Sequence, residues 1–229
     1  MTKINPYISA LLLTMVVISS CMTTAGNSTP EQEWAEPGYW VNLSYEDAQN
    51  ALSAGTIDVN VRTENGFTAL ILAAGGNQNP DVITALITAG ADVHARDNDG
   101  WTPLMFAAGF NQYPEIITAL INAGVDVNAR NEYGLTPLMG AALGNQNPDV
   151  ITALITAGAD INARAEYGIT ALMFAAGDTE NPDVITALLN AGADATLQAE
   201  DGRTAWDLIQ ENEALQGTDA YWELNARRF

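Results

Sequence analysis

Apolar residues follow a repeating helical pattern through most of the chain. Short Ala-rich segments such as Pro103-Leu-Met-Phe-Ala-Ala108 alternate with segments such as Val82-Ile-Thr-Ala-Leu86-Ile87. In the second kind, the apolar residues at i, i+1, i+4 and i+5 line one face of a helix. Polar turn residues separate the segments, so the pattern predicts pairs of short helices.

Two series of glycines recur at a constant interval of 34 positions. Such a fixed interval is typical of stacked repeat architectures. One series, in which Thr follows each Gly two positions later, contains Gly66, Gly100, Gly134, Gly168 and Gly202; the other contains Gly90, Gly124, Gly158 and Gly192.

Each repeat has its own start and stop signals for two helices. Thr102 is a favourable N-cap residue, and Pro103 suits the first helical position. Asn-Pro-Asp segments, as at residues 79–81, predict the start of the second helix, and Gly90 its left-handed end. In the second repeat Tyr113 replaces the capping Asn, which costs about 1 kcal/mol. An extended hairpin then leads to the next repeat.

These motifs closely resemble the ankyrin repeat over about residues 40–225. The family pattern Gly-x-Thr-Pro-Leu appears at residues 100–104 and 134–138, and Gly-Ala-Asp-Ile-Asn-Ala at 158–163. The resemblance implies an all-α repeat solenoid of helix-turn-helix units with extended fingers. The usual period is 33, and we expect the extra residue in the Asn-Gln-Asn-Pro loop. The family's His, which ties neighbouring turns together, is replaced by Ile71, Met105, Met139 and Met173.

The repeats divide the chain into successive segments. A capping half-repeat without a recognisable first helix is expected at residues 39–65, and a capping repeat at 202–229. Solenoids need such ends to cover their last interfaces. Trp206, Tyr221, Trp222 and Leu224 are expected to seal the C-terminal one. The four repeats between the caps are 66–99, 100–133, 134–167 and 168–201.

The N-terminal segment has the features of an export signal. A charged start with Lys3 precedes an apolar run too short to span a bilayer. Ile18-Ser19-Ser20-Cys21 resembles the bacterial lipobox, which implies cleavage after residue 20 and acylation of Cys21. The alternative is an ordinary signal peptide cut nearby. Residues 21–38 are predicted to be the lipidated Cys and a flexible tether. We therefore expect anchoring to the cell envelope, at the outer rather than the inner membrane, with the domain in the periplasm or at the cell surface.

The charge of the chain limits the partners it can have. A formal net charge of −20, from 28 acidic and eight basic residues, repels nucleic acid and favours basic partners. The alternative is that the acidic surface only keeps the protein soluble. We expect a monomer.

The residue inventory does not favour an enzyme. His94, the one histidine, occupies a slot that holds Asn60, Asn128 and Asn162 in other units, so a turn role is expected. No cofactor or zinc site is predicted. The hairpin acids lack the spacing of a calcium loop. The Asp residues that follow the second glycine series are expected to stabilise turns; they are Asp58, Asp92, Asp126, Asp160 and Asp194.

A further series of arginines runs along the hairpins: Arg62, Arg96, Arg130 and Arg164. Pairing with hairpin acids is one interpretation, and a cationic stripe that grips carboxylates is the other. Phe106 and Phe174 are expected in the core. Large residues in slots that face outward in the family mark the predicted partner site; its members are Trp101, Phe110, Tyr113, Arg130, Glu132, Tyr133, Glu166 and Tyr167. The alternative for Trp101 is sideways packing on a neighbouring hairpin.

These expectations favour a lipid-anchored protein-protein interaction module. Its fingers and concave face would bind an envelope or secreted protein. The alternative is a structural envelope spacer without a specific groove partner.

Overall fold

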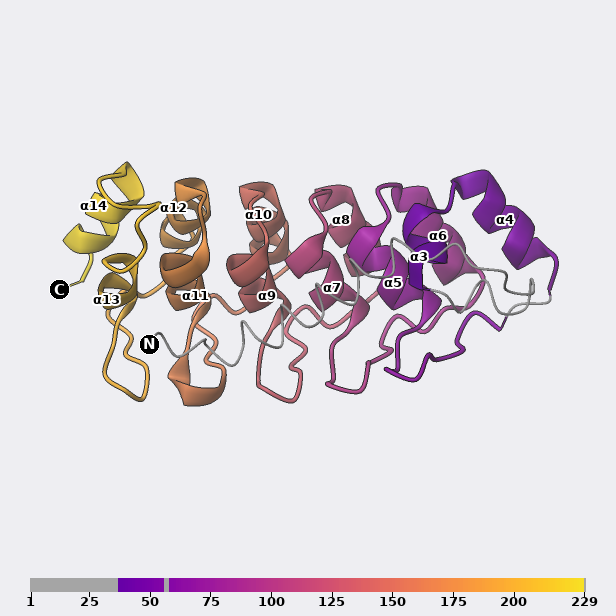
Figure 1. The fold of residues 1–229 in the computed structure, drawn as a ribbon, viewed down its shortest axis with the longest axis horizontal. Coiled ribbons are helices and arrows are strands. Elements are labelled where there is room, and N and C mark those ends of the chain that lie inside the picture. Colours follow the sequence, from indigo (N-terminus) through magenta and orange to yellow (C-terminus); the bar gives the residue numbers. More distant parts are fainter. Residues whose placement is uncertain (1–36, 56–57, 229) are drawn as a thin grey trace.

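The computed structural model describes residues 37–55 and 58–228. The predicted signal peptide, Cys21 and nearly all of the tether lie outside these ranges. Within them the chain forms twelve α-helices and one 3-10 helix, arranged as a row of helix pairs (Figure 1). This confirms the predicted all-α repeat solenoid.

The helices form two layers, with hairpins extending from one edge and short loops closing the other (Figure 1). The first helix of each pair is α3 (Pro37–Asn42), α5 (Ala69–Gly76), α7 (Pro103–Phe110), α9 (Pro137–Gly144), α11 (Ala171–Asp178) or α13 (Ala205–Ile209). The second is α4 (Tyr45–Ser53), α6 (Pro80–Thr88), α8 (Pro114–Asn122), α10 (Pro148–Thr156), α12 (Pro182–Asn190) or α14 (Asp219–Ala226).

The predicted caps begin and end these helices. The Thr102 side chain accepts a hydrogen bond from the Met105 N–H at the start of α7. At the start of α6, Asn79 accepts one from the Asp81 N–H. Tyr113 makes no side-chain cap, as expected from its type. Gly90 follows α6 with φ of 92°, in the left-handed region that glycine adopts most easily.

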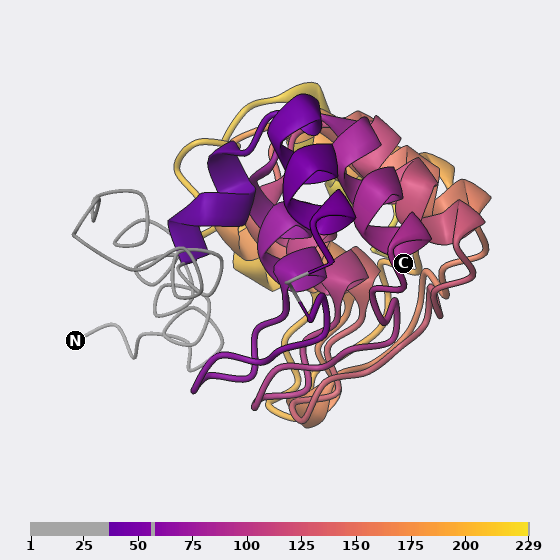
Figure 2. The same ribbon diagram turned by 90° about the vertical axis from the view of Figure 1, so that its right-hand side faces the viewer.

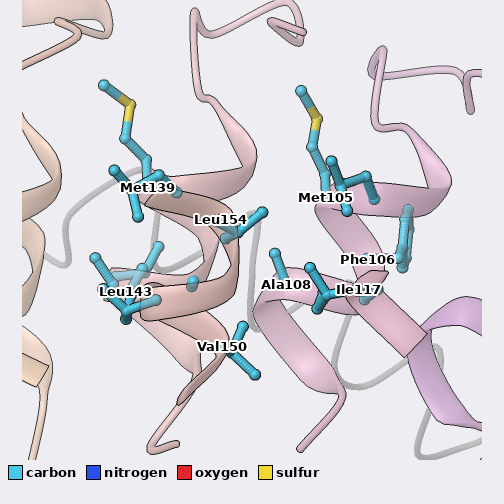
Figure 3. Packing of buried hydrophobic residues seen from close by; sticks show 14 of the residues in the cluster. Met105, Phe106, Ala108, Ile117, Met139, Leu143, Val150 and Leu154 are labelled. Atoms are coloured by element: carbon cyan, nitrogen blue, oxygen red, sulfur yellow. The ribbon is translucent and has the colours of Figure 1, made fainter. Parts of the chain in front are cut away.

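The core runs between the two helix layers. The inner first helices α5, α7, α9 and α11 are nearly all buried, because their Ala-rich sequences allow neighbouring repeats to approach closely. Phe106 and Phe174 are both 1% exposed, which confirms that they are core residues. Met105 and Met139 occupy matching buried positions in adjacent repeats, in the slot of the missing His (Figure 3).

Buried asparagines in the short loops tie each repeat to the one before it. The Asn111 amide donates to the carbonyl oxygens of Ala74 (3.0 Å) and Asn77 (2.8 Å). Asn77 and Asn145, each 34 positions from Asn111, repeat this arrangement, and the half-buried Asn212 does so 33 positions after Thr179, which takes the slot in the fourth repeat. We call the set the asparagine ladder; its members are Asn77, Asn111, Asn145 and Asn212.

The two ends differ from the inner repeats. At the N-terminal end α3 supplies a short first helix, so the expectation of an end without one was wrong. Its six residues lack the Gly-x-Thr signal that marks the other first helices. At the C-terminal end Leu224 is buried and Tyr221 packs on Trp206, with ring centroids 4.8 Å apart. Trp222 is exposed instead of sealing the interface. None of the helices in the described ranges has both the length and the apolar character needed to cross a bilayer.

Candidate protein-binding surface

The hairpins form a continuous row along one edge of the solenoid (Figure 2). Their tips are linked by backbone hydrogen bonds, in which each hairpin donates to the previous one. The Glu132 N–H donates to Asp99 O (3.2 Å), the Glu166 N–H to Tyr133 O (3.2 Å) and the Glu200 N–H to Tyr167 O (2.8 Å). We call the tip dipeptides the tip row: 64–65, 98–99, 132–133, 166–167 and 200–201.

The arginine series holds the hairpins together from the side. The Arg96 guanidinium donates to the carbonyls of Gly100 (3.2 Å) and Arg130 (2.8 Å). Arg130 repeats this with Gly134 and Arg164. Arg96 and Arg130 therefore use backbone carbonyls as partners, where the first interpretation had placed hairpin acids. These hydrogen bonds connect neighbouring turns, which is the role of the family's His that this chain lacks. Arg130 therefore has a structural role at the base of the predicted site.

A second set of hydrogen bonds connects successive hairpins where Asn lies two positions before the Arg. The Asn128 side chain donates to Gly158 O (3.0 Å) and accepts from the Asp160 N–H (2.8 Å). His94 fills that slot in the second hairpin, where its backbone N–H donates to Asp92 (2.9 Å). The aspartates expected to stabilise turns do so, each accepting from the N–H two residues on; they are Asp58, Asp92, Asp126, Asp160 and Asp194. In the described part of the chain, no three His, Cys, Asp or Glu side chains gather in a way that could hold a metal ion.

Tyr133 lies at the centre of the tip row among carboxylates from three hairpins. The pKa of its phenol is raised above its ordinary value, first by the charge of Asp99 and then by burial, Glu132 and Glu166. The local potential around this ring is therefore negative. Such a surface favours a positively charged group over an anion.

Tyr167 occupies the same tip slot one hairpin further along, on a different backbone. It is 56% exposed, and its φ of 57° is the only positive value among the non-glycine residues that the structure describes. A left-handed backbone at an ordinary residue costs roughly 1 kcal/mol. The Glu166–Gly168 3-10 turn imposes it and presents the ring to solvent.

The second hairpin contains a buried carboxylate just behind its tip. Asp97 accepts hydrogen bonds from the N–H groups of Asp99 (3.0 Å) and Trp101 (2.7 Å). Burial raises the pKa of Asp97 to about 6, although those two hydrogen bonds act in the opposite direction. Asn131 makes the same pair of turn bonds in the third hairpin, to Tyr133 and Leu135.

Trp101 does not belong to the surface on which the sequence placed it. It is 2% exposed and lies edge-on to Phe106, with ring centroids 5.7 Å apart. Gly140 of the next repeat lies beside the ring, where a Cβ would make an ordinary van der Waals contact with Trp101 Cζ3 at 3.9 Å. Trp101 is therefore a core residue that packs on α7 and lies beside α9 of the next repeat.

Phe110 and Tyr113 lie away from the tip row. The hairpin precedes α7, whereas Phe110 ends this helix and Tyr113 follows it. Eight helical residues put about 12 Å between those two ends. Phe110 is half-buried against Phe106 (5.8 Å), and the Tyr113 hydroxyl donates to Gln78 Oε1 (3.1 Å). The structure thus brings together Glu132, Tyr133, Glu166 and Tyr167 but not these two residues.

Two tip residues that belong to this surface were not placed in the predicted site. Asp99 and Glu200 flank the two tyrosines from the neighbouring hairpins. The 34-residue interval could have indicated them, because they occupy the same slots as Tyr133 and Glu166.

Comparison with known families gives an independent assignment of the repeats. The family model described as Ankyrin repeats (3 copies) matches residues 42–131 and residues 109–199. No curated protein matches the chain.

Proposed function

The chain belongs to the ankyrin-repeat family, whose repeats generally mediate protein-protein interactions, and we propose that it is an envelope-anchored module that binds a basic protein. Ankyrin-repeat proteins are typically non-enzymatic interaction modules. The partner would be an envelope or secreted protein held on the hairpin edge.

The observation that supports a basic partner is the tip row itself. Exposed or half-exposed rings at Tyr133 and Tyr167 stand among Asp99, Glu132 and Glu166. Tyrosine is enriched at the energetic centres of protein interfaces. The carboxylates and the net charge of −20 would steer a cationic partner toward these rings.

A pull-down with the full-length chain tests this function. Extracts would be passed over the wild-type protein and over a Tyr133→Asn, Tyr167→Asn double variant. Asn is the residue at the same tip slot in the first hairpin, Asn65, so the change suits the local backbone. A specific partner should be lost from the double variant. Retention of every captured protein would favour the spacer function instead.

The anchor has its own experiment. Export and acylation at Cys21 are supported by the lipobox-like sequence of residues 18–21. Cys21→Ala in a bacterial host should move the protein from the membrane fraction to the soluble fraction, because acyl chains provide about 0.8 kcal/mol per buried methylene. A Cys21→Ala protein that stays in the membrane fraction would contradict the anchor.

A further inference from the structure

Two neighbouring tips share a composition that the other three lack. Residues 132–133 and 166–167 are both Glu-Tyr, whereas the remaining tips are Glu64-Asn65, Asn98-Asp99 and Glu200-Asp201. The tip row therefore contains two aromatic residues in the same slot, one repeat apart, although only Tyr167 has a left-handed backbone.

Both tyrosines have acidic neighbours, which surround Tyr133 and lie in the same and the following tip at Tyr167. Tyr133 lies among Asp99, Glu132 and Glu166. Tyr167 follows Glu166, and its carbonyl accepts the Glu200 N–H at 2.8 Å. An aromatic face bordered by carboxylates suits the guanidinium of Arg or the ammonium of Lys, through cation–π attraction and charge-assisted hydrogen bonds.

The distance between the two positions restricts the shape of the ligand. Packed helices lie about 8–10 Å apart, so equivalent tip residues recur at about that interval. A β-strand places side chains on one face every second residue, at about 7 or 13 Å, which misses the interval. A polyproline II helix rises about 3.1 Å per residue with three residues per turn, so its i and i+3 side chains share a face about 9 Å apart.

We propose that the tip row binds a polyproline II segment with a basic side chain at every third position, one held at Tyr133 and the next at Tyr167. This rests on the proposed function, since it specifies the basic partner. The flanking tips with Asp99 and Asp201 add charge but no ring. Two basic residues therefore define the motif, and a third contributes less to the binding affinity.

Peptides of identical composition distinguish the effect of arginine spacing from the effect of total charge. Three nine-residue peptides, each with three Arg and six Pro, would place Arg at every third position, at every second position, or in one run. Binding to the full-length chain would be measured by fluorescence anisotropy at low and at physiological salt. We expect the every-third peptide to bind about fivefold tighter than the other two, because only it reaches both rings.

Matched variants locate the binding. Tyr133→Asn with Tyr167→Asn should weaken the every-third peptide roughly tenfold and abolish the preference for its spacing. The control is Tyr113→Asn, the same exchange at another exposed tyrosine, where the other repeats have a capping Asn. It should leave affinity unchanged.

The outcomes also distinguish failure of the polyproline II motif from failure of the proposed binding to a basic protein. Equal binding of all three peptides, or a preference for the every-second peptide, would overturn the polyproline II motif but would not contradict binding of a basic protein. Failure of every arginine peptide to bind at low salt overturns both. An equal loss of affinity in the Tyr113→Asn control would remove the assignment to the tip row.

Discussion

The short-loop edge and the hairpin edge of the solenoid hold the repeats together in different ways. At the short-loop edge, side chains of the asparagine ladder, buried in all but the last member, donate to carbonyls of the preceding repeat. At the hairpin edge, exposed arginines and the backbone of the tips make the connections. The buried edge therefore requires particular side chains. The hairpin edge lets the residue types at the tips vary from repeat to repeat.

The largest effect should come from breaking the short-loop edge. Asn111→Ala removes two donated hydrogen bonds and leaves the buried carbonyls of Ala74 and Asn77 without them. We expect the free energy of unfolding to fall by about 3 kcal/mol, measured by urea denaturation. Asn122→Ala, at an exposed position in the last turn of α8, is the control, and a similar loss there would contradict a special role for the ladder.

A smaller, stabilising effect should come from the hairpin edge. Asp97 is less acidic when folded than when unfolded, so the folded state retains its proton up to about pH 6. The folded state binds more protons than the unfolded state between about pH 4 and 6, and stability falls as pH rises through that window. Asp97→Asn should remove this fall and raise the free energy of unfolding at pH 7.5. We expect a rise of about 1–2 kcal/mol, because the cost of burying the new amide group offsets part of the gain from removing the buried charge.

Urea denaturation from pH 4 to 8 measures this change. Asn131→Asp, the opposite exchange in the next hairpin, should lower stability at pH 7.5 and add a pH dependence of the same sign. If the Asp97→Asn protein keeps the wild-type pH profile between pH 4 and 6, burial of Asp97 is not its source.

The smallest effect tests whether the ladder can be completed. Thr179 donates instead to Gln146 Oε1 (3.2 Å). By the 34-residue interval, an Asn there would reach the carbonyls of Ala142 and Asn145. Thr179→Asn should raise the melting temperature and stabilise the fold by about 1 kcal/mol. Differential scanning calorimetry measures it, and a destabilised Thr179→Asn protein would show that the fourth repeat follows a different geometry.

The 34-residue interval was enough to predict the fold. Caps, glycine turns and core positions such as Phe106 are local features, so their residue types indicate their roles directly. The two departures at the ends, α3 and Trp222, fall where the repeated pattern stops.

The predicted site was only partly correct, because contacts between repeats join residues 34 or more positions apart. The burial of Trp101 depends on its packing against Phe106 and beside the next repeat. The arginines bind backbone carbonyls, which every residue type has, so the sequence does not identify these partners. The separation of Tyr113 from the tips follows from helix direction and could have been deduced.

One paired measurement tests most directly whether the short-loop edge provides stability and the hairpin edge provides binding. Urea denaturation and binding of the every-third arginine peptide would be measured on Asn111→Ala and on the Tyr133→Asn, Tyr167→Asn double variant. The first protein should lose about 3 kcal/mol of stability and, below its transition, keep its affinity. The second should keep its stability within about 1 kcal/mol and lose roughly tenfold in affinity. Loss of both properties in both proteins, or unchanged affinity in the double variant, would contradict the account.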